Sequence, residues 1–179
     1  MQSLRGHFLL ASPSLRDDSF VQSVILVIRH DVEGAIGLII NRPLEATVAD
    51  ALGDELAVDV QEPLRRGGPC EGPMMVIHDL GQLESGDEVL PGIFYTHARS
   101  DIETVMAAPT PQALYVIGYA GWQPDQLERE MAEGSWSVLP ASSTEVFSVA
   151  SDLWHRLSTR ARLLKFLPPD RIPDDPGLN

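Results

Sequence analysis

Five histidines and one cysteine are the side chains of this sequence best suited to acid–base or nucleophilic chemistry. His30 and His78 each follow an apolar run that predicts a buried strand, and active-site groups often lie at strand ends. If the fold brought them together, they could serve one pocket as the acid and base of a hydrolase or transferase. A structural histidine at the end of a buried strand is the simpler interpretation, and we favour it for both.

Two glycine-rich segments could approach a ligand closely. Gly118–Trp122 reads Gly-Tyr-Ala-Gly-Trp and is expected to form a turn between a strand and a helix, whose N-terminus could attract an anion. Gly67-Gly68-Pro69 precedes Cys70, so exposed amides there could lower the pKa of its thiol or bind an anion. The simpler interpretation is a close backbone turn in each place, with Trp122 covering the core and Cys70 inert.

Other catalytic patterns are missing from the sequence. It has no Gly-rich phosphate loop, no dinucleotide fingerprint and no Gly-x-Ser-x-Gly elbow. No two histidines have the spacing of a helical metal site, and a single cysteine excludes a cysteine-based zinc site. We therefore predict neither a metal nor a cofactor. Glu128, Glu130 and Glu133 fall on a predicted amphipathic helix, where carboxylates usually form a solvated face.

The elements that must position these residues are mostly strands. Apolar runs and turn residues predict strands over 6–11, 24–28, 35–40, 56–60, 74–78, 89–90, 93–95, 113–119, 136–139 and 146–147, with a turn or bulge over 65–69. Caps and periodicity predict helices over 47–52, 100–108, 124–133 and 151–167, the first two opened by Thr47 with Asp50 and Ser100 with Glu103. Hairpin-length connections between most strands favour a mostly antiparallel α+β domain.

The last predicted helix carries an apolar stripe at helical spacing, which predicts a core-facing side: Ala150, Leu153, Trp154, Leu157, Ala161 and Leu164. Leu163 and Phe166 fall on the opposite side. The helix therefore either breaks near Ser158-Thr159 or is apolar on two faces.

Length and charge restrict the class of protein. A chain of 179 residues predicts one domain, here residues 1–167, followed by a loose tail over 168–179 that is rich in Pro and Asp. With 13 basic and 26 acidic side chains the formal net charge is −13, which repels a phosphate backbone. Only 153–167 is basic, and we interpret it as a solvated helix face. A single cysteine excludes an intrachain disulfide and indicates the cytoplasm, and no apolar run predicts a membrane span.

Three blocks of the sequence, taken together and in this order, resemble the YqgE/AlgH family of uncharacterised bacterial proteins. They are Gly6–Pro13 continuing through His30 to Gly34–Pro43, Gly67-Gly68-Pro69 with His78, and Gly118–Trp122 followed by Gln126–Glu128, Glu130, Gly134 and Trp136. The resemblance covers roughly residues 5–157. The C-terminus departs from the family, which often ends in a short strand-like segment and a Gly-His-Ala-like tail.

The resemblance implies a cytosolic α+β domain with a barrel-like sheet and surrounding helices. One branch of the family is named from the regulation of alginate synthesis, and members are often labelled transcriptional regulators. The resemblance implies no catalytic residues. The positions that match suggest a ligand-binding surface at Asn41, Gly67, Gly68, His78, Gly118, Tyr119 and Trp122.

Three functions stay open at this point. We rank first a non-enzymatic regulatory or binding module, a monomer or weak dimer, that acts through a protein partner or a small ligand. The first alternative is an undescribed hydrolase or transferase with a pocket near His30, His78 and the 118–122 turn. The second is a direct DNA-binding regulator, which the acidic composition disfavours.

Overall fold

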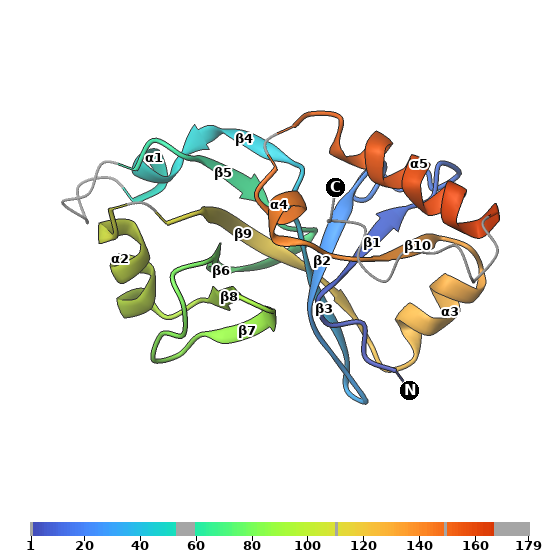
Figure 1. Cartoon of the computed structure of the whole chain (residues 1–179), viewed down its shortest axis with the longest axis horizontal. Helices are drawn as coiled ribbons and strands as arrows, with labels where there is room; N and C mark the ends of the chain where they lie inside the picture. The colour runs from blue at the N-terminus through green and yellow to red at the C-terminus, as the bar shows by residue number, and fades with distance from the viewer. Residues whose placement is uncertain (1, 53–59, 110, 149, 167–179) are drawn as a thin grey trace.

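The fold is a curled, mixed sheet with helices on both sides (Figure 1). The computed structural model describes residues 2–52, 60–109, 111–148 and 150–166. Its strands are β1 (His7–Ala11), β2 (Val24–Asp31), β3 (Gly34–Ile39), β4 (Pro43–Thr47), β5 (Pro63–Arg66), β6 (Cys70–His78), β7 (Asp87–Leu90), β8 (Ile93–Thr96), β9 (Ala113–Trp122) and β10 (Trp136–Pro140). Its helices are α1 (Val48–Leu52), α2 (Arg99–Ala107), α3 (Gln126–Ala132), α4 (Ser143–Val146) and α5 (Leu153–Phe166).

The strands pair in the order β10-β1-β2-β3-β9-β6-β8-β7. Strand β5 also pairs with β9, on the same edge as β3, and β4 pairs with β5. The pairings are antiparallel except that of β5 with β9, which is parallel. The α+β class, the single domain and the mostly antiparallel, partly closed sheet are therefore confirmed. No helix in the described ranges has the length and apolar character needed to cross a membrane.

The centre of the sheet is buried on both faces, and residues 24–28 of β2 are apolar and buried at every position. Along β2, Leu26 and its alternate neighbours join one core, while Ile25 and Val27 point to a second core on the opposite face. The first core lines the inner, concave side and runs over both halves of the sheet, from Phe8 to Ile77. A continuous apolar run is what a strand covered on both faces requires.

Each core is closed by its own helix. Helix α5 covers the inner face through Leu153, Trp154, Leu157 and Ala161, as its apolar stripe predicts. It continues through Ser158-Thr159 without a break, and Leu163 on its other side is exposed. Helix α3 closes the second core through Leu127. Helix α2 closes a third core at the other end of the sheet, together with Val48 of α1.

Strand β9 belongs to both halves of the sheet and changes its partner along its length. It pairs with β5 at Val116 and Ile117 and with β3 from Ala120 to Trp122. Gly67 links β9 to β3 at a point between these two pairings. Its N–H donates to the Ile117 carbonyl at 2.8 Å, and its own carbonyl accepts from the Ile39 N–H at 2.8 Å.

Several local predictions are confirmed. The Thr47 hydroxyl accepts the Asp50 N–H at 3.1 Å, and the Asp50 carboxylate accepts the Thr47 N–H at 2.8 Å, as in a reciprocal helix cap. The hairpin of β2 and β3 turns at residues 32–33, and that of β7 and β8 turns at Pro91-Gly92. Of the strand expected over 56–60, residues 56–59 lie outside the described residues.

Other local predictions are wrong. The segment 118–122 is not a turn but the last part of β9, and Arg65 and Arg66 lie in β5 rather than in a bulge. Residues 146–147 do not form a strand, because Val146 ends helix α4.

The capping box expected at the start of α2 is also wrong. Ala98 is the N-cap, no side chain caps the helix, and Ser100 already lies inside it. The buried acid here is Asp101. Its carboxylate accepts from the Thr96 hydroxyl and from the Ser85 N–H, which ties α2 to the strand before it.

We predict that Gly67→Ala destabilises the fold by about 3 kcal/mol, because overpacking a closed backbone contact forces the chain to move. A Cβ at Gly67 would lie 2.2 Å from the Gly118 carbonyl oxygen. The matched control is Gly86→Ala, whose Cβ would meet its nearest atom at 3.4 Å and should change stability by within about 1 kcal/mol. Urea unfolding of both variants is the measurement. Equal stabilities would show that β9 tolerates a wider crossing.

Candidate functional site

Three of the predicted site glycines meet where the chain after β5 crosses β9. We call Gly67, Gly68 and Gly118 the glycine crossing. A Cβ at Gly68 would lie 2.2 Å from the Tyr119 carbonyl oxygen, and one at Gly118 would lie 2.7 Å from the Cys70 carbonyl oxygen. Gly118 also has φ of +74°, which favours glycine. Neighbouring backbone thus fills the space beside each glycine.

Tyr119 and Cys70 lie directly beside this crossing as a cross-strand pair. The Tyr119 ring lies over two further glycines, since a Cβ at Gly72 or Gly121 would approach it within 3.0 or 3.2 Å. Cys70 is half-buried. The two glycine-rich segments, residues 67–70 and 118–122, therefore lie side by side in the fold, although about 50 residues separate them in the chain.

Asn41, which follows β3, forms side-chain hydrogen bonds with the chain around the start of β2. Its side-chain oxygen accepts the Val24 N–H at 2.8 Å, and its amide donates to the Gln22 carbonyl at 2.9 Å. Gln22 has φ of +55°, so the amide fixes an unusual bend just before β2. Asn41 lies two residues beyond Ile39, which contacts Gly67.

Trp122 belongs to an aromatic cluster at the far end of β9. Its ring packs at right angles to Trp136, and Phe20 lies against both rings. Glu130 of α3 receives both indole N–H groups on one carboxylate oxygen, at 2.9 Å from Trp122 and 2.7 Å from Trp136. Its other oxygen accepts the Gln126 amide at 2.8 Å. The expectation that Glu130 lies on a solvated face is wrong.

His30 is likewise paired with α3. Its Nε2 lies 2.8 Å from the Glu128 carboxylate, and its Nδ1 accepts the Leu4 N–H at 3.0 Å. The ring therefore donates to Glu128 while it holds the N-terminal segment. Sequence reasoning missed this pair because 98 residues separate its members.

His78 has no comparable partners. Its side chain is fully buried, neither ring nitrogen has a hydrogen-bond partner among the described residues, and the ring stacks on Phe94 at 5.9 Å. Burial lowers the pKa of His78, and the nearby carboxylates of Asp101 and Asp79 offset only part of that effect. The imidazole is therefore held in its neutral form.

The two histidines do not meet. His78 pairs with Ala113 at the start of β9, whereas His30 pairs with Ala35, which pairs with Trp122 at the end of β9. The nine residue steps from Ala113 to Trp122 span about 30 Å at the usual rise of a strand. His78 and Trp122 are separated in the same way, so the predicted site residues divide between the two ends of β9 and the glycine crossing between them.

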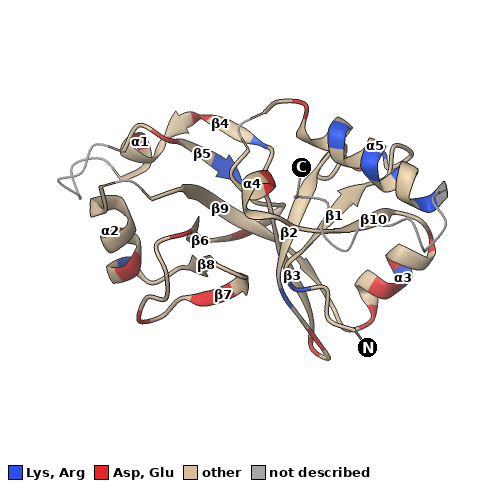
Figure 2. Cartoon of the chain, viewed as in Figure 1, with Lys and Arg blue, Asp and Glu red and all other residues tan. Residues whose placement is uncertain are grey.

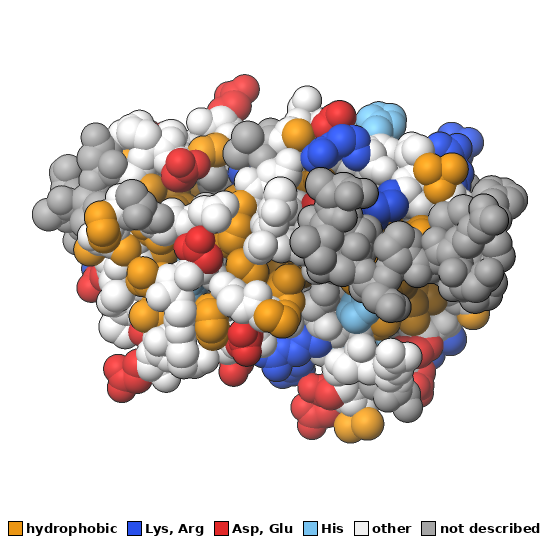
Figure 3. Space-filling view, in the orientation of Figure 1, with side chains coloured by type: hydrophobic (Ala, Val, Ile, Leu, Met, Phe, Trp, Pro, Cys, Tyr) orange, Lys and Arg blue, Asp and Glu red, His pale blue; other side chains and the backbone are white. Residues whose placement is uncertain are grey.

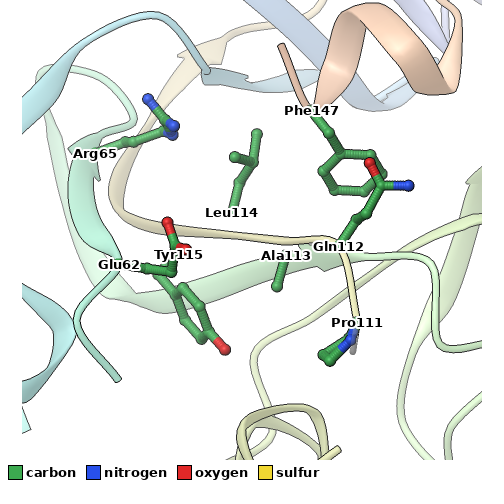
Figure 4. Close-up of a pocket in the computed structure, with 8 residues that line it drawn as sticks. All are labelled: Glu62, Arg65, Pro111, Gln112, Ala113, Leu114, Tyr115 and Phe147. Atoms are coloured by element: carbon green, nitrogen blue, oxygen red, sulfur yellow. The ribbon is translucent and has the colours of Figure 1, made fainter. Parts of the chain in front are cut away.

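A cleft of about 350 Å³ lies beside the first residues of β9 (Figure 4). We call it the Arg65 cleft. Figure 4 shows the Arg65 guanidinium, Leu114 and Phe147 on one side of the β9 ribbon, with Tyr115 on the other. Its lining is Glu62, Arg65, Pro111, Gln112, Ala113, Leu114, Tyr115 and Phe147. None of these residues was among the sequence candidates.

Arg65 is an unusual component of this cleft because it is a cation that is only 5% exposed. Its Nε has no hydrogen-bond partner, and no ion pair among the described residues includes it. Burial lowers the pKa of Arg65, while the carboxylate of Glu62 acts in the opposite direction. Burial and the same carboxylate raise the pKa of Tyr115 to about 12, so its hydroxyl stays protonated at neutral pH.

Arg65 could have been found from alternation. In a strand that contains Leu64 as a core residue, Arg65 must point to the opposite face, and both faces of this sheet are covered. The adjoining glycines favoured a turn instead, which would have left both arginines in solvent.

Helix α5 carries several basic residues and no acid, whereas basic and acidic residues are both found on other elements (Figure 2). Arg156 pairs with Asp152 at 3.1 Å, and Arg160 pairs with Glu145. In the space-filling view acidic side chains are scattered over the same face rather than gathered into one patch (Figure 3). The basic face of α5 is thus partly neutralised within the fold.

Fold and cleft together define a class: a single α+β domain whose curled, mostly antiparallel sheet is covered by helices and holds a small cleft beside its shared strand. The AlgH-like family model matches residues 8–163. A UPF0301 protein of Chlorobaculum tepidum is 35% identical over 180 residues, covering 97% of this chain and 95% of the relative. One of Nitrosococcus oceani is 41% identical over 154 residues, covering 80% of this chain and 81% of the relative. The chain belongs to the AlgH-like family.

Two solved structures have the same fold. The solution structure of the AlgH protein of Pseudomonas aeruginosa superposes with a TM-score of 0.72 at 29% identity, covering 94% of this chain and 98% of that one. A crystal structure of a protein from Corynebacterium diphtheriae gives a TM-score of 0.72 at 22% identity, covering 89% of this chain and 88% of that one. The family resemblance found in the sequence is confirmed.

We predict that His78 makes the protein less stable as pH falls below 6.5, the ordinary pKa of histidine. The unfolded chain then takes up a proton that buried His78 accepts only at lower pH, so protonation favours unfolding. In His78→Leu this contribution disappears. Urea unfolding between pH 7 and pH 5 is the measurement, and the stability of wild type should fall relative to the variant. Parallel pH profiles would show that the ring is solvated.

We predict that Glu130→Ala costs about 3 kcal/mol, because two buried indole N–H groups lose a charged acceptor. The emission of the buried tryptophans should change with it. Glu133→Ala is the matched control on the same helix, since Glu133 is exposed, and it should change stability by less than about 0.5 kcal/mol. Thermal unfolding followed by tryptophan fluorescence measures both. Similar costs for the two variants would contradict the role of Glu130.

Proposed function

We propose that the protein is a non-enzymatic binding module whose ligand occupies the Arg65 cleft and whose regulatory effect passes through a protein partner rather than through DNA. The observation that carries the proposal is the buried, unpaired guanidinium of Arg65 beside an open cleft of ligand size. We place this module in the cytoplasm, where a single thiol stays reduced.

A buried arginine is unfavourable unless it is paired. Moving a charge out of water costs several kcal/mol, and hydrogen bonds to an anion are the usual compensation. Asp101, another buried charged residue of this fold, is compensated in this way, because its carboxylate accepts hydrogen bonds from the Thr96 hydroxyl and the Ser85 N–H. An anionic group of a ligand in the cleft would supply the partner that Arg65 lacks within the described residues.

The histidines give less support to an enzyme. A general acid and base must reach one substrate, and His30 and His78 lie at opposite ends of β9. His78 is fully buried and His30 is engaged on both ring nitrogens. The acid–base pair on which the hydrolase or transferase alternative depended is therefore not assembled.

The charge distribution gives less support to direct DNA binding. The net charge is −13, and two arginines of α5 are paired with carboxylates. An acidic surface repels phosphates and slows their approach. A role in gene expression would then depend on another protein that contacts the nucleic acid.

We predict that Arg65→Met raises the free energy of unfolding of the ligand-free protein by about 1 kcal/mol or more, because methionine fills the same space without a desolvated charge. Arg66→Met is the matched control. Arg66 is exposed in the same strand and its replacement should change stability by less than about 0.5 kcal/mol. Urea unfolding measures both. A loss of stability in Arg65→Met would show that the guanidinium serves the fold.

Native mass spectrometry tests occupancy directly. Protein purified without denaturation from the cells that make it should carry a bound small molecule, as a mass above that of the chain. Arg65→Met should lose that mass and Arg66→Met should retain it. A bare mass in all three proteins, or a mass that Arg65→Met retains, would contradict the proposed function.

A further inference from the structure

Resting on the proposed function, we infer that the Arg65 cleft takes a free amino acid with an apolar side chain, bound as a zwitterion by Arg65 at the inner end and Glu62 at the rim. The two charged residues, the apolar wall and the size of the cleft each restrict the ligand independently.

Arg65 selects the anionic group. A guanidinium presents its N–H donors in a planar fork that matches a carboxylate with two parallel hydrogen bonds. Arg65 is only 5% exposed, and its Nε is buried without a hydrogen-bond partner among the described residues. A carboxylate that enters the cleft is therefore drawn to its inner end, where water competes least.

Glu62 selects a cation on the same ligand. It is exposed and lines the cleft, so it forms the rim. Its carboxylate acts electrostatically on both Arg65 and Tyr115, so its charge is felt at two residues that line the cleft. Yet no ion pair joins Glu62 to Arg65, although both line the cleft. A small molecule that carries an ammonium and a carboxylate would give each of the two residues its own counter-ion.

The net charge of the protein also favours a zwitterionic ligand. A ligand that is purely anionic would meet the Glu62 carboxylate at the rim and the field of a chain with net charge −13. A zwitterion has no net charge to repel. It therefore reaches a buried guanidinium in an acidic protein more easily than a phosphate or a dicarboxylate does.

The rest of the lining suits an apolar side chain. Pro111, Leu114 and Phe147 provide the apolar wall, and Gln112 adds one amide (Figure 4). A volume of about 350 Å³ lies at the lower end for small-molecule sites. In addition, β9 pairs with β6 from Ala113 but with β5 only at Val116 and Ile117, so no described strand covers its other edge at the cleft. Main-chain groups there can bind the polar atoms of the ligand.

The test uses three probes that differ in one charge each: L-leucine, L-leucinamide without the carboxylate, and N-acetyl-L-leucine without the ammonium. Isothermal titration calorimetry of the full chain, freed of any retained molecule by dialysis, measures their affinities. L-Leucine should bind at least tenfold more tightly than either analogue. L-Phenylalanine should also bind, since the wall is apolar.

Matched variants locate the two charges. Arg65→Gln should abolish binding of L-leucine, and Arg66→Gln should preserve it. Glu62→Gln should lower the affinity for L-leucine at least fivefold. It should also reduce the difference in affinity between L-leucine and N-acetyl-L-leucine. Glu45→Gln, a replacement of another exposed acid, should leave both affinities unchanged. Urea unfolding of each variant checks that it is folded before titration.

Each contrary result has its own meaning. If N-acetyl-L-leucine binds as tightly as L-leucine, the zwitterion is wrong and the site takes a simple carboxylate. If neither L-leucine nor L-phenylalanine binds, but native mass spectrometry finds a molecule that Arg65→Met loses, the amino-acid inference is overturned and the proposed function stands. If no molecule depends on Arg65 in either experiment, both fail.

Discussion

The close crossing of two backbones at Gly67 and Gly118 is the contact on which the rest of the structure depends. There β9 leaves β5 and joins β3, and the backbones can come this close because a Cβ at Gly67 would lie 2.2 Å from the Gly118 carbonyl oxygen. The shared inner core, the two outer cores and the Arg65 cleft all follow from that change of partner. The cleft forms where β9 has not yet met β5.

The fold could be predicted from the sequence to a large extent because its strongest signals are local. The apolar runs of β2 and β9, the Thr47 cap and the stripe on α5 each depend on neighbours in the chain. Errors arose where a glycine had a tertiary role. Gly118 ends no strand, because β3 continues the pairing that β5 begins. Nothing near Ala98 in the chain shows that Asp101 is drawn toward Thr96 and Ser85 instead of capping α2.

The site was less accessible to sequence reasoning because its residues act through distant partners. Glu128 and Glu130 have the spacing of a solvated helix face, yet His30, Trp122 and Trp136 approach them from three strands. Arg65 has the opposite relation to its surroundings. It is a polar side chain placed where the covered sheet gives it no partner among the described residues. Buried charge without compensation is more common at functional sites than elsewhere, which is why we place the proposed site at Arg65 rather than at a histidine.

The sharing of β9 also determines the order in which the protein can fold as it is synthesised. β1 and β2 form an early pair, but β3 gains its second neighbour only when residues 120–122 have been made, some 80 positions later. β1 gains its other neighbour only with β10, through the pairing of His7 with Pro140. Such long sequence separations slow folding, since a large loop must close before the contact forms. The apolar strands of the N-terminal third therefore stay uncovered on the ribosome until most of the chain has emerged, and unpaired apolar strands are prone to aggregate during such a period.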